Sequence, residues 1–266
     1  MNLILNIFVA SLIYPIGLFA QDQIPVDLNT QWLRRDWDKC RENVTATYHN
    51  QAFTIQSDHA AALFWQIPTQ SGQALEIDHN QSWVQKCERP PMGFEKDIQK
   101  GNRDRLISVK DYPYISWQWR ITNTIDDKDT ANKKGEIKKD GDDFAAKVGI
   151  SILNHKEELR EIAYLWTRTI PEETVLTQKT TVVRWLYEFT WYRIVAQSGD
   201  QQLNTWVNEK RNLYEDFKKI YPNEEPREIV RVYLMSDSDN TGSTTSGAFA
   251  NLLFHKNPPA GYVKAE

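Results

Sequence analysis

Cysteine and recognisable metal or nucleotide motifs are scarce in this sequence. Its 266 residues include only two cysteines, Cys40 and Cys87. Two thiols alone cannot complete a structural zinc site, and the five histidines show no H-E-x-x-H or similar spacing. The Walker A, G-x-G-x-x-G and G-x-S-x-G patterns are also missing. The sequence therefore indicates no zinc centre, no common nucleotide-binding loop and no identifiable catalytic nucleophile.

An excess of positive charge is lacking as well. The chain carries 32 basic and 36 acidic side chains, a formal net charge of −4, and both signs are spread along its length. Nucleic-acid binding needs a basic surface that neutralises phosphates, and an anionic membrane surface attracts polybasic runs. We therefore expect neither nucleic acid nor a membrane surface as a partner.

Charged side chains are absent from residues 1–20, an apolar run that ends in Ala20 before a polar stretch. This pattern predicts a secretory signal peptide, and hence a periplasmic or extracellular protein. The alternative is an uncleaved membrane anchor, because the run is just long enough to cross a bilayer. No later stretch is apolar enough to span a membrane, so we expect residues 21–266 to form a soluble mature protein.

Export bears on the two cysteines, because disulfides persist in oxidising compartments. We expect a disulfide between Cys40 and Cys87. On the chain-entropy model, this bond stabilises the fold by roughly 4 kcal/mol. The alternative is a pair of buried free thiols.

Aromatic residues are plentiful: they make up 12% of the chain and include 10 tryptophans. Many alternate with polar residues, the period-2 pattern of strands with one buried face. The clearest case is residues 114–121, which place Trp117 and Trp119 on one face. Further strand patterns occupy residues 52–57, 60–67, 144–152, 161–167, 180–195 and 229–254, with a weaker one at 75–84.

Helix is well indicated only over residues 201–221, where apolar residues recur at spacings of three and four before Pro222. Residues 87–105 and 123–141 are polar or charge-dense, and we expect surface loops there. A strand-dominated chain with one amphipathic helix packed on a sheet predicts a mainly β, single-domain antiparallel sandwich of jelly-roll type.

Five polar or aromatic side chains project opposite the core-facing residues of their strands: Gln118, Arg120, Lys147, Arg231 and Tyr233. If the three strands that carry them are neighbours, they form one polar face with aromatic edges. Such a face holds sugars by bidentate hydrogen bonds and ring stacking. The alternative is a solvated outer face with surface ion pairs.

Five residues with short oxygen-bearing side chains stand at the ends of two strongly patterned strands: Asp142, Asp143, Asp237, Asp239 and Asn240. We expect them to converge, because antiparallel neighbours place the start of one strand beside the end of the other. Their oxygens suit a structural Ca²⁺ ion. The segment is not an EF-hand loop, however, because Ala248 stands at the twelfth position from Asp237, where such a loop has its glutamate. The alternative, which we favour slightly, is a set of Asx-turns with a salt bridge to Lys147 or Arg231.

Five motifs follow one another along the chain: W-x-W at Trp117, GDDFAAKVGIS from Gly141, YLW from Tyr164, WVNEKRNLYEDF from Trp206 and MSDSDNTG from Met235. Taken together, they resemble the exported bacterial family called domain of unknown function 3047. The resemblance is strong over residues 114–254. It implies export and a common sandwich, and it brings no established activity.

These observations support three functional hypotheses. The leading one is an exported module that binds a carbohydrate or an envelope glycan and has no cofactor beyond the structural Ca²⁺ considered above. The second is a glycan-cleaving hydrolase or lyase in which the aspartates act as acid and base. The third is a structural or assembly protein of the cell envelope that binds another protein.

Overall fold

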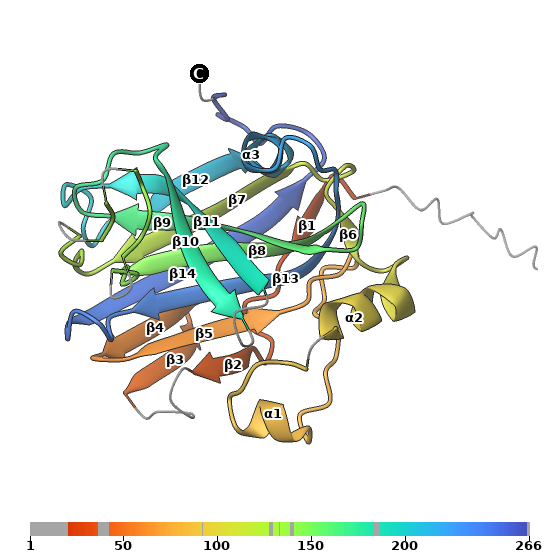
Figure 1. The fold of residues 1–266 in the computed structure, drawn as a ribbon, viewed down its shortest axis with the longest axis horizontal. Helices are drawn as coiled ribbons and strands as arrows, with labels where there is room; N and C mark the ends of the chain where they lie inside the picture. Colours follow the sequence, from red (N-terminus) through yellow and green to blue (C-terminus); the bar gives the residue numbers. More distant parts are fainter. Residues whose placement is uncertain are drawn as a thin grey trace, which may run out of the picture.

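The computed structural model describes residues 21–36, 43–91, 93–127, 130–132, 134–138, 141–182 and 187–264, with side chains omitted for residues 180–189. Two β-sheets pack face to face in these residues (Figure 1). The predicted mainly β sandwich is confirmed. The predicted signal peptide, residues 1–20, and Cys40 lie outside the described residues.

The smaller sheet has six strands. Its order is β12 (Val207–Asn212), β7 (Tyr114–Ile121), β14 (Thr244–His255), β4 (Ala52–Asp58) and β3 (Val44–His49), and β1 (Gln23–Pro25) also pairs with β14. Every pairing in this sheet is antiparallel.

The larger sheet has eight strands. Its order is β10 (Val175–Val182), β11 (Tyr187–Ser198), β9 (Leu159–Thr167), β8 (Ala146–Asn154), β13 (Pro226–Asp237), β5 (Ala61–Gln66) and β2 (Leu33–Asp36), and β6 (Ile107–Ser108) also pairs with β13. The pairing of β11 with β9 is parallel and the others are antiparallel.

Aromatic side chains from both sheets meet in the core. Trp117 of β7 lies 5.0 Å from Tyr164 of β9 between ring centroids, and Trp119 lies 5.6 Å from Trp166. All four rings are at most 2% exposed. The alternation in β7 predicted that Trp117 and Trp119 fill the core, and this is confirmed.

The outward face of the eight-stranded sheet is partly covered by the two short helices α1 (Ser82–Gln85) and α2 (Phe94–Asn102). Trp65 of β5 stacks on Trp83 of α1 at 6.2 Å, and Phe94 of α2 contacts both rings edge-on. Figure 1 shows both helices beside β2 and β5. The loop predicted over residues 87–105 therefore contains a helix, because Phe94 can bury its ring against the sheet.

The described part of residues 123–141 covers another part of the same outward face. Ile137 packs in a buried cluster with Phe144, Leu165, Leu176 and Val195. The described part of residues 123–141 is therefore not a purely exposed loop. Asp127, 4% exposed, anchors it by accepting hydrogen bonds from the backbone N–H groups of residues 168 and 169 at 2.7 and 2.8 Å.

The long helix predicted over residues 201–221 is much shorter. Residues Val207–Asn212 form β12 beside β7, and only Leu213–Ile220 form the helix α3. Asn212 begins α3 by accepting a hydrogen bond from the Glu215 N–H at 3.0 Å. Pairing with β7 overrides the local helical spacing, because it satisfies the backbone of β12 across the sheet.

The weak strand predicted at residues 75–84 is also wrong, since this segment is irregular before α1. No helix within the described ranges combines the length and apolar character that crossing a membrane requires.

Candidate functional site

The predicted ligand-binding residues do not share one face. Gln118 and Arg120 belong to β7 in the six-stranded sheet, whereas Lys147, Arg231 and Tyr233 belong to β8 and β13 in the eight-stranded sheet. The common face required that the three strands be neighbours, and this condition holds only for β8 and β13. Alternation gives the face of a residue within its strand, but it does not say which sheet the strand joins.

Gln118 and Arg120 are engaged locally on the outside of the six-stranded sheet. The Gln118 amide donates to Asn208 Oδ1 at 2.7 Å and accepts from Asn251 Nδ2 at 2.6 Å, which links three adjacent strands. The Arg120 guanidinium lies 5.0 Å from the centroid of the Trp206 ring. These contacts hold both side chains on the sheet opposite to the one that carries the other three residues.

Of the remaining three residues, Lys147 and Tyr233 line a depression on the outward face of the eight-stranded sheet, and Arg231 lies next to its lining residue Glu161. We call this depression the outward pocket. It has a volume of about 140 Å³. Twelve residues line it: Arg35, Leu63, Arg89, Asp142, Lys147, Glu161, Gln178, Trp191, Arg193, Tyr233, Met235 and Asp237. Arg89 comes from the segment between α1 and α2, and Asp142 from the segment before β8. The pocket thus lies where the two coverings of the sheet leave a gap.

Tyr233 lies flat across the floor of the outward pocket. It pairs with Gly149 of β8, and a Cβ atom at Gly149 would stand 1.9 Å from Tyr233 Cζ. The missing side chain lets the ring cross β8 toward β9. There, the Tyr233 hydroxyl donates to Glu161 Oε1 at 2.8 Å. Burial, with the neighbouring Glu161 charge, raises the pKa of Tyr233 well above its ordinary value, so the hydroxyl remains a donor.

Glu161 is held in a strongly cationic setting. Its carboxylate lies 3.2 Å from Arg193 Nη1 and 4.0 Å from Arg231 Nη2, and it is 5% exposed. Arg231 is fixed in turn by Ser151, whose Oγ accepts from Arg231 Nε at 3.1 Å. The two guanidinium groups and the tyrosine hydroxyl thus hold this carboxylate in place.

Lys147 forms a buried ion pair at another side of the pocket. Its Nζ lies 2.5 Å from Asp237 Oδ2 and donates to the Asp142 carbonyl oxygen at 2.5 Å. The two side chains of the pair are each 4% exposed. Asp237 Oδ1 is also buried and accepts no hydrogen bond from the described residues. A salt bridge from Lys147 to one of the aspartates, Asp237, is therefore present, as in the alternative favoured from the sequence.

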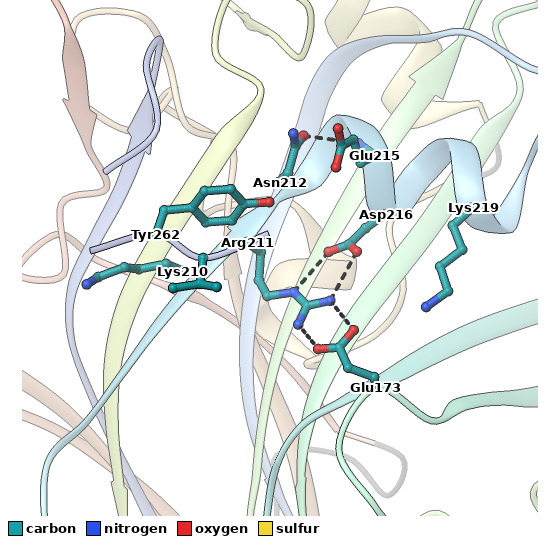
Figure 2. A pocket seen from close by; sticks show the side chains of 9 residues that line it. Glu173, Lys210, Arg211, Asn212, Glu215, Asp216, Lys219 and Tyr262 are labelled. Atoms are coloured by element: carbon teal, nitrogen blue, oxygen red, sulfur yellow. Dashed lines mark hydrogen bonds and ion pairs between the residues drawn. The ribbon is translucent and has the colours of Figure 1, made fainter. Parts of the chain in front are cut away.

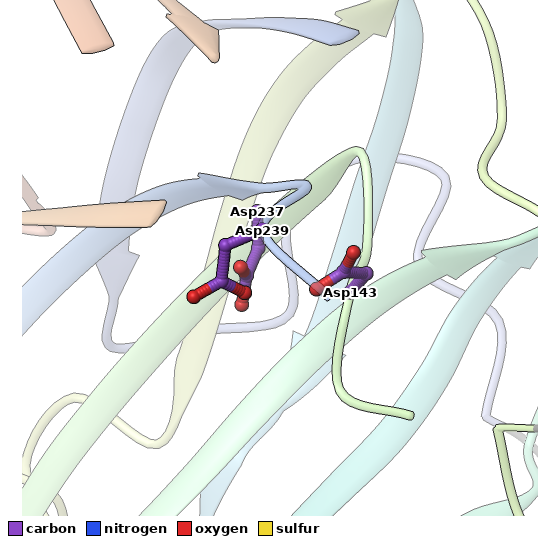
Figure 3. A group of neighbouring side chains, drawn as sticks. All are labelled: Asp143, Asp237 and Asp239. Carbon is purple, nitrogen blue, oxygen red and sulfur yellow. The ribbon is translucent and has the colours of Figure 1, made fainter. Parts of the chain in front are cut away.

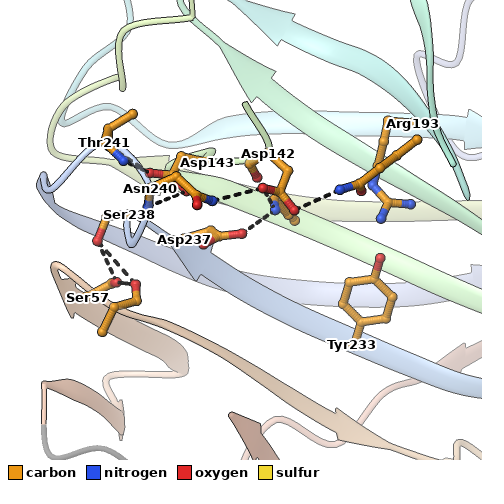
Figure 4. A network of polar contacts seen from close by, with 12 residues as sticks. Ser57, Asp142, Asp143, Arg193, Tyr233, Asp237, Ser238, Asn240 and Thr241 are labelled. Carbon is orange, nitrogen blue, oxygen red and sulfur yellow. Dashed lines mark hydrogen bonds and ion pairs between the residues drawn. The ribbon is translucent and has the colours of Figure 1, made fainter. Parts of the chain in front are cut away.

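Of the predicted aspartate and asparagine residues, Asp142, Asp143, Asp237 and Asn240 come together in Figure 4. Asn240 Nδ2 donates to Asp142 Oδ1 at 2.9 Å and to Asp143 Oδ1 at 3.2 Å. Asp143 Oδ2 also accepts from the Thr241 N–H and Oγ1, both at 2.7 Å. The turn after β13 is thus tied to the segment that precedes β8.

Three of these carboxylates lie close enough to surround a cation. One oxygen each of Asp143, Asp237 and Asp239 lies within 4.8 Å of the others (Figure 3). Burial raises the pKa of Asp237 well above its ordinary value in spite of Lys147. Burial and the Asp143 charge also raise the pKa of Asp239. These hard oxygen ligands fit Ca²⁺ in kind, while Lys147 already neutralises part of the charge.

A separate charged pocket lies beside α3 (Figure 2). The Arg211 guanidinium bridges Asp216, at 3.1 Å, and Glu173, at 3.0 Å. Tyr164 donates to Asp216 Oδ2 at 2.8 Å. These groups satisfy one another, so the network fastens α3 and the Glu173 segment to the interior and fits a structural role.

Sequence reasoning missed much of the outward pocket, including Arg35, Glu161, Trp191 and Arg193. A usable signal existed for three of them, because Glu161 alternates with Ile162, and Trp191 and Arg193 alternate with Ile194, in strand patterns. Arg35 and Arg89 had no such signal, since the first lies in a four-residue strand and the second in a loop.

Comparison with solved structures finds remote similarities to β proteins. The xyloglucanase domain of NopAA, a type three effector from Sinorhizobium fredii, is 8% identical with a TM-score of 0.37, covering 83% of this chain and 91% of that domain. The family 11 xylanase from Neocallimastix patriciarum is 8% identical with a TM-score of 0.32, covering 85% and 100%. A mutant of the family 29 carbohydrate-binding module CBM29-2 is 8% identical with a TM-score of 0.27, covering 89% and 98%.

These TM-scores are too low to support an argument about function, which therefore depends on the residues of the chain itself. No curated protein matches the sequence. One family model matches residues 102–253, more than half of the chain. The chain therefore belongs to the family described as "Protein of unknown function (DUF3047)".

Proposed function

We propose that this protein binds a carbohydrate or envelope glycan in the outward pocket, without cleaving it. The observation that carries the proposal is the composition of the pocket: the partly exposed Trp191 stands among arginine, glutamine and carboxylate side chains. Aromatic rings stack on the apolar faces of sugars, and planar polar groups bond pairs of hydroxyls. Both kinds of group face the same pocket on one sheet.

Binding is favoured over cleavage because the carboxylates of the pocket are already paired. Asp237 is bonded to Lys147, Glu161 to Tyr233, and Asp142 Oδ2 accepts from Gln178 Nε2 at 2.9 Å. A glycosidase needs one carboxyl group that gives up its proton to the substrate and a second that faces the sugar. The raised pKa of Asp237 would suit the first role, so cleavage is retained as an outcome of the test.

The proposal includes export. The apolar residues 1–20 support it, as they would deliver the mature chain to the periplasm or the exterior, where envelope glycans are found. A protein-binding role in envelope assembly is the third hypothesis, and no surface of the described residues specifically favours it.

A glycan array read together with product analysis tests the proposal. We expect retention on a subset of glycans, no new reducing or unsaturated ends, and loss of retention for Trp191→Ala. The matched control is Trp206→Ala, since Trp206 lies under Arg120 on the other sheet. Release of new chain ends would identify an enzyme instead. A folded protein that binds no glycan would end the proposal.

A further inference from the structure

The charges in the outward pocket are unusual for a chain of net charge −4. Its lining contains four cationic side chains, Arg35, Arg89, Lys147 and Arg193, against three acidic ones. Beside the pocket, Arg231 lies near Glu161 and 3.7 Å from Glu95, so this further pair adds one charge of each sign and leaves the surplus at one. A local positive surplus inside a negative molecule calls for a ligand that carries negative charge.

The positive charges of Arg89 and Arg231 act on Arg35. Two of the acids of the pocket are already paired elsewhere, Asp237 with Lys147 at 2.5 Å and Glu161 with Arg193 at 3.2 Å. Burial, together with the positive charges of Arg89 and Arg231, lowers the pKa of Arg35 to about 10, and the opposing effect of Glu161 is smaller. The guanidinium groups thus repel one another, and an anion placed among them would relieve that repulsion.

Strand register places these cations around a floor of low polarity. Arg35 of β2 is in register with Leu63 of β5, Leu63 with Met235 of β13, and Met235 with Lys147 of β8. Neighbouring strands are about 4.8 Å apart, so roughly 14 Å separates the backbones of Arg35 and Lys147. Arg193 enters from β11, on the far side of β9 and β8. A sugar-sized group fits between cations that approach from both sides.

We infer that the outward pocket selects acidic saccharides and binds the carboxylate of a uronic acid between the Arg35 and Arg89 side chains, with the sugar ring against Trp191. A planar guanidinium matches a carboxylate through two parallel hydrogen bonds, whereas a neutral sugar offers only hydroxyl groups there. This inference rests on the proposed function, because it specifies the class of glycan bound at that site.

Isothermal titration with a matched pair of ligands tests the inference. The probes are an oligogalacturonide and the same oligomer with its carboxyl groups methyl-esterified. We expect the acid to bind at least about tenfold more tightly, because hydrogen bonds to charged groups are stronger than those between neutral groups. The difference should shrink at high salt, because ions screen exposed charges.

Arginine variants locate the effect. Arg35→Gln and Arg89→Gln should each lower the affinity for the acid about tenfold and lower the affinity for the ester by clearly less, because the ester keeps only hydrogen bonds between its hydroxyls and these side chains. Arg120→Gln is the matched control, since its guanidinium lies on the six-stranded sheet. Thermal melting checks that each variant folds. Arg89 is exposed in a loop, so its variant stays informative if Arg35→Gln fails to fold.

Three results would overturn the inference. Equal affinity for acid and ester, or unchanged binding in both arginine variants, would leave glycan binding intact and remove the acid selectivity. Sulfate or acetate binding as tightly as the oligogalacturonide would show that the sugar contributes nothing. Failure of every glycan, acidic and neutral, would reject the proposed function itself.

Discussion

Single residues in this protein show how burial makes a charged side chain depend on an oppositely charged partner. The side chains of Lys147 and Asp237 are each 4% exposed, so water solvates neither of them well. Each is tolerated in the interior because the other is present. The same rule applies to Glu161, which is 5% exposed and lies between Arg193 and Arg231.

Lys147→Ala should therefore be strongly destabilising. It leaves Asp237 buried beside Asp142 and Asp143 without its counter-ion, and breaking a buried pair from one side costs about 3–5 kcal/mol. Urea unfolding measures the loss. The double variant Lys147→Ala with Asp237→Ala should recover part of it, because no unpaired charge remains. A double variant that loses as much as the sum of both single variants would contradict the pairing.

Calcium titration decides whether the aspartates Asp143, Asp237 and Asp239 also hold a metal ion. We expect no chelator-reversible rise in melting temperature, since Lys147 compensates Asp237, and Asp143 accepts bonds from Asn240 and Thr241. A rise that chelator reverses, and that Asp239→Asn abolishes, would instead establish a calcium site.

Glu209 gives a prediction about pH. Its Oε1 accepts from Trp119 Nε1 at 3.2 Å, and burial raises its pKa from the ordinary 4.5 to about 8. The folded state therefore keeps a proton that the unfolded chain releases above pH 4.5. Stability present below that pH is lost as the pH rises toward about 8, by at most about 1.4 kcal/mol per pH unit.

The Glu209→Gln variant cannot lose this proton. We expect its melting temperature to decline less than that of the wild type between about pH 5 and 8. Parallel melting profiles for the two proteins would show that Glu209 titrates normally.

At the level of strands, the outward pocket depends on how β8 and β13 are matched. Their register sets Tyr233 against Gly149, and the small Ala163 follows on β9 in the same row. A large ring can lie flat only where the neighbouring strands carry little side chain. The pocket floor and the Tyr233–Glu161 hydrogen bond thus depend on one glycine.

Gly149→Ala should disturb both stability and binding. The new methyl group would stand 1.9 Å from Tyr233 Cζ, so the ring must leave its place and Glu161 loses a donor. Overpacking of this kind costs about 1–3 kcal/mol, and glycan affinity should fall with it. Gly101→Ala is the matched control, because a Cβ there meets nothing within 4 Å and α2 gains helix propensity. A Gly149→Ala protein as stable as the wild type would contradict the placement of the ring.

For the whole molecule, the sequence predicts which face of a strand is buried better than it predicts which strands pair within one sheet. Alternation correctly puts Val232 and Leu234 in the core and Tyr233 on the outward face, because a strand has a period of two whatever its neighbours. Which sheet β7 joins depends on long-range strand pairing, and no local sequence pattern contains that information. For this reason Gln118 does not share a face with the candidate residues of β8 and β13.

The aspartates converge as predicted because Asp142 precedes β8 and Asp237 ends β13, and these two strands are antiparallel neighbours. The pocket that accompanies them was not predictable in full. Arg35 reaches it through the pairing of β2 with β5, and Arg89 reaches it through a loop. Both depend on tertiary contacts between segments that are distant in the chain.

The predicted Cys40–Cys87 disulfide would fasten one such loop to the sandwich. Cys87 is 7% exposed, and its carbonyl oxygen accepts from the Asp36 N–H at 3.0 Å, at the end of β2. Cys40 lies outside the described residues, yet it follows Asp36 closely in the chain, within a reach of at most about 14 Å. The bond would therefore hold the segment that carries Arg89 close to Arg35, on one side of the outward pocket.

Reduction of the oxidised protein should lower its melting temperature by about 10 °C. A bond contributing roughly 4 kcal/mol accounts for this shift, since each kcal/mol corresponds to about 2–4 °C at this size. The Cys40→Ser, Cys87→Ser double variant should melt at the lower temperature with or without reductant. Non-reducing mass measurement of the exported protein that finds two alkylatable thiols would remove the bond. Arg89 would then be held beside Arg35 by packing of α1 and α2 alone, and acid selectivity should be the same in both redox states.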